Sequence, residues 1–452
     1  MDIEALEALR PALEEFALDF ESCIKTRPSR EHLRRYMAGQ LSDLHRKSVE
    51  PIALMAGIPP RTLQQFLSIH QWEAESMVDC VQRRVAERHG YDRAIALIDE
   101  TSFPKKGDKT PGVQRQHCGA TGKIDNCVVA VHLGYVAGDF HALLDGDIYL
   151  PDSWLSDPER CLEAGIPEDA RYRTKPDMAL EQLAAACHRG VEMAWLCADE
   201  LYGRSHEFRL GVADLGLSYV VEIPHNLTGW MASRSGDCKP RRVDRLWQRG
   251  GPTWETWHVK DTEKGPAVWE VRAVRFQPCE EGVAGDEQWL IIARNALKRD
   301  EVKYFLCNAP ADAPLAEMLR VAFYRWHIER LFQESKDETG LDHFEGRRYQ
   351  GWKRHLALTS LTILFLSEQR KRMRSEDEPF TLEQIKLVIE VQLDPEMPRS
   401  EVRRQLQKVL TRVTYYQRRN AVARRSHAKT KRRRLAEAGV DLASAQRCPQ
   451  FL

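Results

Sequence analysis

Two carboxylates stand where an apolar run ends. The run at residues 95–98 is followed directly by Asp99 and Glu100, and Lys105 and Lys106 come a few residues later. Acids in this position either cap a turn at the end of a strand or hold a cation there. A bound divalent cation neutralises phosphate charge, and nearby lysines can hold the flanking phosphates of a nucleic acid. The segment is therefore compatible both with a plain turn and with a metal site that acts on phosphodiesters.

The same pattern occurs a second time, and a third acid lies on a predicted helix. Asp199 and Glu200 follow the apolar run of AWLCADELYG. The segment RWHIERLFQESK predicts a helix that carries Arg325, Glu329 and Lys336, which are separated by four and then seven residues. At about 100° per residue, these three side chains share one helix face. The residues alone leave open whether this face is functional or only solvated, and which acid of each pair takes part.

A cluster of such acids requires cations. Two bare carboxylates 4 Å apart repel each other by roughly 1 kcal/mol in water and by about 4 kcal/mol at an effective dielectric constant of 20. Hard oxygen ligands suit Mg²⁺ or Mn²⁺, whereas cysteine or histidine ligands would favour zinc. Two such ions can clamp the attacking and leaving oxygens of a phosphodiester. Three converging acids would therefore predict metal-dependent phosphoryl transfer.

The apolar runs that precede these acids belong to a strand-rich region. Three strand-like runs follow one another, and a helix-like segment, DMALEQLAAACHRG, then separates them from two more. The first three predict an antiparallel meander, and the later strand–helix–strand alternation predicts parallel additions to it. The predicted strands are 95–99, 126–136, 140–150, 194–200 and 218–224.

The N-terminal region has helical periodicity and contains a pattern typical of a helix-turn-helix. In PIALMAGIPPRTLQQFL, Ala53 lies where two helices touch, Gly57 lies in the turn and Leu63 locks the second helix. Arg61 and Gln64 would then point outward near the start of the second helix, where base contacts are made. A plain helical hairpin is the alternative.

The charge of the chain is balanced overall but uneven along its length. Lys+Arg and Asp+Glu are both 67, yet residues 402–436 hold thirteen lysines or arginines and no acid. Such a block is a solvated helix face or an arm that binds a polyanion. We expect it to contact DNA phosphates rather than bases, through residues that include Arg418, Arg419, Arg424 and Arg425.

Composition and motifs exclude several classes of protein. The N-terminus has no signal-peptide pattern, and the longest apolar stretch, LALTSLTILFL, is too short to span a membrane. Eleven cysteines without a C-x-x-C motif indicate reduced thiols in a cytoplasmic protein rather than a disulfide framework. GATGK lacks the spacing and the hydroxyl residue of a phosphate-binding loop, so no nucleotide is expected.

Taken together, these features resemble a DDE transposase of a bacterial insertion sequence. The segments DETSFPKKG, RQHCGATGKIDNC, YLPDSW, ADELYG, GLDHFEGRRYQGWKRH and YYQRRNAVARRSH are similar to the insertion-sequence family 701 group. The R-x3-E-x6-K spacing matches part of the Y-R-E-K signature of that superfamily. Ala322 stands where the signature tyrosine belongs, so the role of the tyrosine is not carried over.

The resemblance implies an α/β fold with a ribonuclease-H-like catalytic core. It assigns Asp99, Asp199 and Glu329 as catalytic ligands of two Mg²⁺ ions, for which Mn²⁺ would substitute. It implies cut-and-paste chemistry on double-stranded DNA: water cleaves the transposon ends, and the freed 3′-hydroxyl attacks target DNA. No covalent enzyme–DNA bond and no ATP are involved. A homodimer in the synaptic complex and a cytoplasmic, nucleoid-associated location are further expectations, and Lys105, Lys106, Arg325 and Lys336 would hold phosphates.

The predicted domains follow from this assignment. They are a helical N-terminal domain (1–90), the first part of the core (91–224), a strand-rich insertion (225–316), the completion of the core with the catalytic helix (317–372) and a helical C-terminal region with the basic arm (373–452).

Three alternatives remain open. Glu334 is a rival to Glu329, although it lies about 140° round the helix. A domesticated transposase would bind DNA without cutting it, and the presence of all three acids argues against this alternative. A tyrosine recombinase would use a covalent intermediate, with Tyr349 as the nucleophile and the cations of WKRH beside it.

Overall fold

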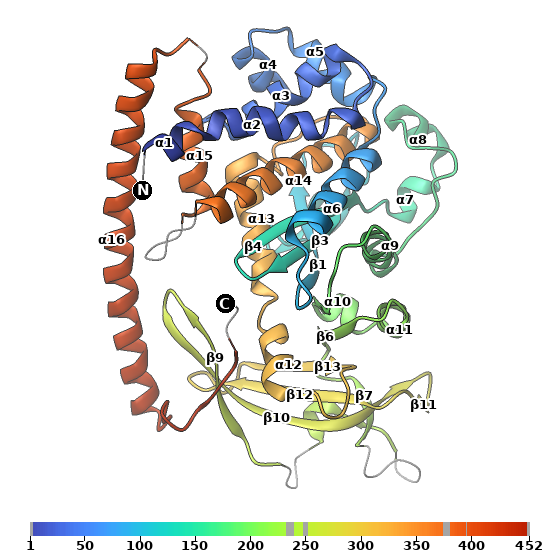
Figure 1. The fold of residues 1–452 in the computed structure, drawn as a ribbon. Coiled ribbons are helices and arrows are strands. Elements are labelled where there is room, and N and C mark those ends of the chain that lie inside the picture. Colours follow the sequence, from blue (N-terminus) through green and yellow to red (C-terminus); the bar gives the residue numbers. More distant parts are fainter. Residues whose placement is uncertain (1–2, 232–238, 247–251, 374–379, 395, 450–452) are drawn as a thin grey trace. The chain divides into compact units, whose positions relative to one another are not determined.

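The computed structural model describes residues 3–231, 239–246, 252–373, 380–394 and 396–449 (Figure 1). The chain falls into two compact units, each made of three separate stretches. The first unit is Met1–Tyr91, Asp99–Glu192 and Ile328–Tyr416, and the second is Asp92–Ile98, Met193–His327 and Gln417–Leu452.

The first unit begins with helices that surround one long buried helix. Helix α14 (Tyr349–Arg372) is buried along most of its length because apolar and small residues occupy all of its faces. It packs against several of the N-terminal helices. These elements are α1 (Ile3–Glu7), α2 (Leu9–Asp19), η1 (Glu21–Cys23), α3 (Arg27–Leu41), α4 (Val49–Met55), α5 (Pro60–Ser68) and α6 (Ala74–His89).

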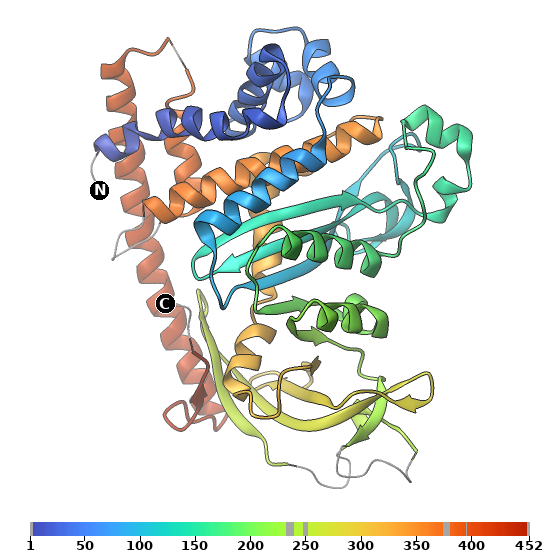
Figure 2. The same ribbon diagram turned by 45° about the vertical axis from the view of Figure 1, so that its right-hand side comes forward.

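The sheet of the first unit is antiparallel. Strand β3 (Lys123–Ala137) pairs with β2 (Gln114–Cys118) through its first residues and with β4 (Phe140–Ile148) through its later ones. Helices α14 and α6 lie across one face of the β3–β4 ribbon, and α9 (Lys175–His188) lies on the other (Figure 2). The strands are therefore buried on both faces, which explains their nearly continuous apolar runs.

Shorter elements and the C-terminal helices complete this part of the chain. Helix α9 begins with a capping box in which the side chains of Thr174 and Asp177 each accept from the backbone of the other. The remaining elements are α7 (Asp152–Leu155), α8 (Pro158–Ala164), α15 (Leu382–Glu390) and two helices that belong only in part to this unit, α13 (Trp326–Thr339) from Ile328 onward and α16 (Arg399–Glu437) up to Tyr416.

The second unit is built on a mixed sheet. The start of β1 (Ile95–Pro104) pairs in parallel with β5 (Trp195–Ala198), and β5 pairs in parallel with β6 (Ser218–Glu222). From β6 onward the ladder is antiparallel, through β13 (Val302–Cys307) and β12 (Gln288–Asn295) to β10 (Gly265–Glu280). The remaining elements are α10 (Glu200–Gly203), α11 (His206–Asp214), β7 (Thr228–Met231), β8 (Arg241–Arg242), η3 (Val243–Arg245), β9 (Glu255–Thr262), β11 (Val283–Ala284), α12 (Leu315–Ala322) and β14 (Gln446–Arg447).

The large mixed sheet and the many helices agree with the predicted α/β class. All five of these predicted strands are present: the second and third strands of the predicted meander, β3 and β4, pair antiparallel, and β5 pairs in parallel with β1 and β6. Strand β2 was not predicted, because its residues are polar and its exposed and half-buried positions alternate without an apolar face. Within the described ranges, no helix is long and apolar enough to cross a bilayer.

Candidate active site and nucleic-acid interface

Two of the predicted catalytic residues follow a registered pair of strand residues. In the parallel ladder between β1 and β5, Ile98 is the partner of Ala198. Asp99 is the next residue after the first member of this pair, and Asp199 is the next residue after the second. Asp199 directly follows the carboxyl end of β5, whereas β1 continues to Pro104, so the expected strand end at Asp99 is wrong and Asp99 lies within β1 where its printed pairing with β5 stops. The two residues that precede these aspartates in the chain are therefore strand partners.

Hydrogen bonds fix both aspartates locally. The Oδ1 atom of Asp99 accepts from the backbone N–H of Glu100 at 2.8 Å. The Oδ1 atom of Asp199 accepts from the N–H of Leu201 at 2.8 Å and so caps the N-terminus of α10. An N-cap role by itself would account for an aspartate at position 199.

The neighbouring glutamates have cationic partners of their own. Lys175 Nζ, at the start of α9, lies 2.9 Å from Oε1 of Glu100. Arg204 Nη2 lies 2.7 Å from Oε1 of Glu200. Each glutamate therefore has a cation within ion-pair distance, and the choice between the acids of each pair stays a prediction. No spacing in the sequence indicates the first ion pair, because its members are 75 residues apart.

The two acids of α13 lie in different surroundings. Glu329 is exposed in the first helical turn. Glu334 is mostly buried, and its Oε2 atom lies 2.8 Å from Nε2 of His141 on β4, while Arg330 Nε donates to its Oε1 at 2.8 Å. Burial opposes ionisation of Glu334, but its contacts with His141 and Arg330 outweigh burial and hold its pKa at about 2. Glu334 is therefore part of a packed ion pair, which favours Glu329 as the third catalytic acid.

The prediction that Arg325 lies on the same helix as Glu329 is wrong. Helix α12 ends at Ala322 and α13 begins at Trp326, so Arg325 lies in the turn between them. Lys260 Nζ donates to the carbonyl of Phe323 at 3.0 Å. The Phe323 ring also packs against other aromatic rings of the second unit, Trp269 and Phe305, with centroids 4.9 and 6.1 Å away. These tertiary contacts end the helix where the local sequence would continue it.

The cations predicted to hold phosphates differ in exposure. Lys106 is exposed, whereas Lys105 is half-buried and makes its contacts within the first unit. Its Nζ donates to the carbonyl of Phe344 at 2.8 Å and lies 4.9 Å from the centroid of the Trp352 ring. Burial lowers the pKa of Lys105 to about 8 and also lowers the pKa of the half-buried Lys336. Of the two adjacent lysines, Lys106 is the better placed to meet a ligand.

Both helices of the predicted helix-turn-helix are present, with a turn between them. Helices α4 and α5 are joined through Gly57, whose φ of +65° lies in the left-handed region that favours glycine. Ala53 and Leu63 are fully buried between helices, while Arg61 and Gln64 are exposed on α5. The second helix therefore has an outward polar face, which fits both a helix-turn-helix and a plain helical hairpin.

An arginine that the sequence did not single out for this role holds the end of α5. Arg354 of α14 is buried, and its guanidinium donates to the carbonyls of Phe66, Leu67, His70 and Trp72. It thus satisfies backbone groups that the end of a helix leaves without partners. Burial lowers its pKa to about 10. No local pattern indicates this contact, because Arg354 lies far from α5 in sequence.

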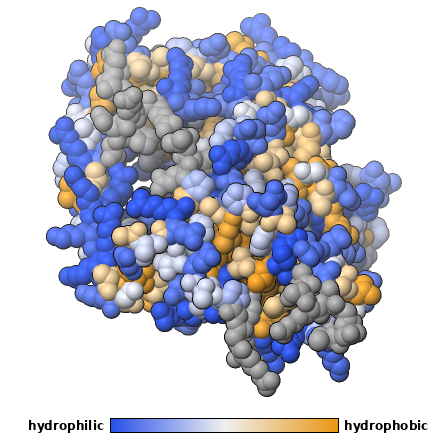
Figure 3. All heavy atoms as spheres, turned by 60° about the horizontal axis from the view of Figure 1, so that its bottom comes forward, coloured by the Kyte–Doolittle hydropathy of each residue, from blue (hydrophilic) through white to orange (hydrophobic). Residues whose placement is uncertain are grey.

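The basic block forms a single exposed helix. Helix α16 spans 39 residues, and hydrophilic side chains cover most of the side of the molecule where it lies (the left-hand side in Figure 3). The four arginines singled out from the sequence, Arg418, Arg419, Arg424 and Arg425, are all exposed. Such a helix can attract a phosphate backbone along much of its length.

The three predicted ligands offer oxygen donors only, which is the donor set that Mg²⁺ or Mn²⁺ prefers. Asp99 and Glu329 belong to the first unit, whereas Asp199 belongs to the second. Among the residues that the structure describes, no group of three or more His, Cys, Asp or Glu side chains is arranged so that it could hold a metal ion. The chemistry of the donors therefore fits the ions. That the three carboxylates lie close enough together to share metal ions stays a prediction.

Comparisons with known proteins agree with these features. Residues 19–277 match the family model described as DDE superfamily endonuclease. The chain is similar to the probable transposase for insertion sequence element IS701 of Microchaete diplosiphon, with 33% identity over 217 residues. That alignment covers 47% of this chain and 54% of the relative. The chain thus spans about half the length of the curated relative that it matches.

Proposed function

Because the chain belongs to the DDE superfamily of endonucleases, we propose that it is a DNA transposase that moves an insertion sequence by a cut-and-paste reaction. It cleaves DNA at the transposon ends and joins the freed 3′-hydroxyl to target DNA. The observation that carries this proposal is the position of Asp99 and Asp199, each directly after one member of the registered pair Ile98 and Ala198. The match to the IS701 transposase supports the same reaction.

In this proposal the catalytic centre consists of Asp99, Asp199 and Glu329, which would hold two Mg²⁺ ions. When bound, the ions neutralise phosphate charge and lower the pKa of a water or hydroxyl nucleophile. The carboxylates supply fixed negative charge that holds the cations. The backbone N–H groups of Glu100 and Leu201 keep one oxygen of each aspartate in place, so these side chains are oriented before DNA arrives.

The surrounding cations would position the DNA strand. Lys106 is exposed a few residues beyond Asp99, and Lys336 lies on the same face of α13 as Glu329, seven residues later. Arg325, in the turn before α13, could hold a phosphate through two parallel N–H groups. Lys105 contributes by keeping the chain beyond β1 fastened to the carbonyl of Phe344.

Recognition of DNA would be divided between two elements. The outward residues of α5, Arg61 and Gln64, are proposed to read base edges at the transposon ends. The exposed arginines of α16 are proposed to bind phosphates without regard to sequence. Pairing of two transposon ends would require two copies of the chain, so a homodimer in the synaptic complex is part of the proposal. The setting would be the bacterial cytoplasm, at the nucleoid.

One alternative is a domesticated protein that binds DNA without cutting it. All three acids are present in the sequence, which favours an active enzyme. The test is incubation of the protein with candidate element ends and Mn²⁺, with the cut sites mapped at nucleotide resolution. Cleavage that depends on the metal and is lost in Asp99→Asn and Asp199→Asn would support the transposase. Binding of the ends without cleavage by the unsubstituted protein would favour the domesticated form.

The tyrosine-recombinase alternative is disfavoured by the surroundings of its required residues. Tyr349 is only 7% exposed, and burial raises the pKa of its hydroxyl. Arg354 is occupied by backbone carbonyls, and His355 is buried between Tyr36 and the carbonyl of Leu341. A nucleophile and its cations would have to leave these contacts to reach DNA. A covalent protein–DNA adduct that disappears in Tyr349→Phe would reverse this conclusion.

A further inference from the structure

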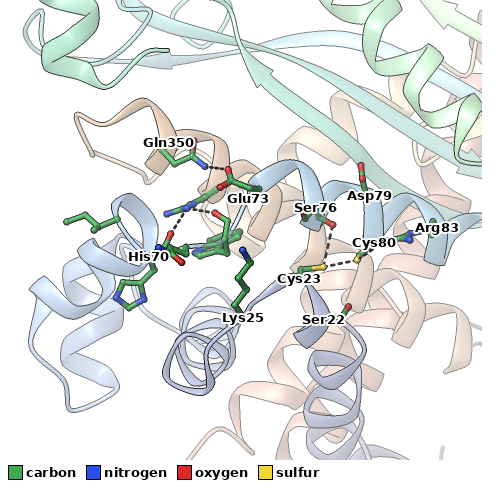
Figure 4. A pocket seen from close by; sticks show the side chains of 14 residues that line it. Ser22, Cys23, Lys25, His70, Glu73, Ser76, Asp79, Cys80, Arg83 and Gln350 are labelled. Carbon is green, nitrogen blue, oxygen red and sulfur yellow. Dashed lines mark hydrogen bonds between the residues drawn. The ribbon is translucent and has the colours of Figure 1, made fainter. Parts of the chain in front are cut away.

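Two cysteines from different elements of the first unit meet side by side. Cys23 ends η1, and Cys80 lies in the middle of α6. The Sγ atom of Cys23 lies 2.7 Å from the Sγ atom of Cys80, and it also lies 3.4 Å from the carbonyl of Ser76 (Figure 4). The two residues are 57 positions apart in sequence. The fold therefore brings together two thiols that no C-x-x-C motif in the sequence indicates.

The two sulfurs can be reached from solvent. Both side chains are half-buried, and both line a pocket of about 970 Å³ in the first unit. The wall of this pocket is largely polar, and it includes Lys25, Asp79 and Arg83 (Figure 4). A small polar oxidant can enter a pocket of this size and polarity. Reactive thiols are found in such partly exposed places, whereas fully buried cysteines are inert.

The surroundings make the two thiols unequal. Cys23 donates a hydrogen bond to Cys80, and the Nη2 atom of Arg83 lies 3.4 Å from the Cys80 sulfur. The hydrogen bond from Cys23 lowers the pKa of Cys80 to about 6, and the charge of Arg83 adds to this against the effect of burial. The same hydrogen bond, together with burial, raises the pKa of Cys23. Cys80 is thus the thiolate at neutral pH and Cys23 the thiol beside it.

We propose that Cys23 and Cys80 form a reversible oxidation site that reacts with hydroperoxides and closes to a disulfide between η1 and α6. The proposal does not depend on DNA cleavage and would stand if the proposed function failed. In this reaction Cys80 attacks the hydroperoxide, and Cys23 then attacks the oxidised Cys80 to form the disulfide.

The reaction balances in two steps. The Cys80 thiolate attacks one oxygen of hydrogen peroxide, the O–O bond breaks, and the departing hydroxide takes a proton from solvent to become water. Cys80 is then a sulfenic acid. Cys23 gives up its thiol proton as its sulfur attacks the sulfur of Cys80; the S–O bond breaks, and the hydroxide leaves with that proton as a second water. Two thiols are oxidised by two electrons, and an external dithiol reverses the change by exchange.

The disulfide would close a loop that contains α3, α4 and α5. Helix α5 ends at Ser68, two residues before His70, which lines the pocket. A cross-link restricts the unfolded chain more than the folded one. Oxidation should therefore raise the resistance of these helices to proteolysis, and reduction should restore the original rate of cleavage.

The test uses the reduced full-length protein and hydrogen peroxide in small molar excess. After the reaction, free thiols are blocked and peptides are mapped without reduction. We expect a Cys23–Cys80 cross-linked peptide that disappears with dithiothreitol. In Cys23→Ser, we expect a dimedone-reactive sulfenic acid on Cys80, and in Cys80→Ser a loss of oxidation at Cys23 by about tenfold or more. Arg83→Gln should slow the reaction, because it removes the charge nearest the Cys80 sulfur.

Cys161 provides the matched control. It is also half-buried, but its thiol donates to the carbonyl of Trp154 at 3.1 Å, and burial raises its pKa. Cys161→Ser should leave the rate of oxidation unchanged. Iodoacetamide labelling of the unsubstituted protein requires no variant to fold, and it should modify Cys80 fastest, with a midpoint well below pH 8. Equal labelling of Cys80 and Cys161, or oxidation without the Cys23–Cys80 peptide, would overturn the proposal.

Discussion

Nε2 of His141 lies 2.8 Å from the carboxylate of Glu334, inside the first unit. This contact separates the two acids of α13, because Glu334 is engaged in packing while Glu329 stays exposed one turn earlier. The sequence alone offered both as the third catalytic acid. The partner that distinguishes them comes from β4, far away along the chain.

The first prediction follows from this difference. Glu329→Gln should lower metal-dependent cleavage by about 100-fold or more, with little change in DNA binding or melting temperature, because it removes charge from an exposed position. Glu334→Gln should instead destabilise the fold by about 1–3 kcal/mol and leave cleavage intact below the melting temperature. End-cleavage assays and thermal melting of both variants check this. Loss of cleavage in a folded Glu334→Gln protein would exchange the two assignments.

The second prediction concerns the pH dependence of stability. Burial raises the pKa of Asp145 to about 7, and repulsion from Asp147 adds to it, against the attraction of Lys353 and Arg189. A raised carboxyl pKa means that the folded state binds the proton more tightly than the unfolded state does. The stabilisation from Asp145 is therefore complete below about pH 4, is lost as the pH rises, and is gone above about pH 7.

Comparing the melting curves of the unsubstituted protein and Asp145→Asn separates the effect of Asp145 from that of the histidines, which titrate over the same pH range. The difference in melting temperature between the unsubstituted protein and Asp145→Asn should shift by a few degrees between pH 4 and pH 7, in favour of the variant at the higher pH. Glu87→Gln, at an exposed position on α6, is the matched control and should follow the unsubstituted protein. A pH-independent difference for Asp145→Asn would show that its carboxyl titrates normally.

The third prediction separates the two adjacent lysines. Lys105→Ala should lower stability, because the carbonyl of Phe344 loses its donor and the Trp352 ring loses its cation. Lys106→Ala should leave stability unchanged and weaken binding of transposon-end DNA, with cleavage reduced in proportion. Melting temperature and binding isotherms on the same preparations give both readouts. The reverse pattern would place Lys105 in the DNA contact.

The fourth prediction concerns α16. Replacing Arg418, Arg419, Arg424 and Arg425 by Ala should weaken binding equally for all DNA sequences. It should also reduce the slope of log affinity against log salt by about one for each phosphate that the variant no longer neutralises. Four exposed arginines to which no role in DNA binding is assigned, changed together to Ala, serve as the control: Arg27, Arg88, Arg171 and Arg299. A loss of affinity confined to the transposon ends would show that the helix reads bases.

The elements of the fold were largely predictable, because their apolar periodicity is strong. The runs at 95–99 and 194–200 predicted two buried strands, and the structure pairs them in parallel. Strand β2 could not be found in this way, since its residues QRQHC carry no apolar face and the strand depends on its pairing with β3. The break before Trp326 was also hidden, because a lysine from another element, Lys260, binds the carbonyl that ends α12.

The candidate site was predictable in its residue types but not in their partners. Adjacent acids after an apolar run left open the choice between Asp99 and Glu100, and the ion pair of Glu100 with Lys175 is a contact that the local sequence does not indicate. Local sequence reflects propensity and periodicity, whereas such pairs depend on which distant element packs alongside. The pairing of Cys23 with Cys80 could not be predicted for the same reason, because the two residues lie 57 positions apart on elements that meet only in the fold.

The carbonyl contacts of Arg354 bear on how this protein can diverge. On the proposal that α5 reads DNA, the residues that hold this helix and the residues that read are different: Arg354 and Leu63 hold it from inside, while Arg61 and Gln64 face outward. Substitutions at the outward positions can therefore accumulate without destabilising the helix. Preference for terminal repeats can drift together with the repeats themselves, and separate lineages of the element can cease to mobilise one another while their catalytic cores stay interchangeable.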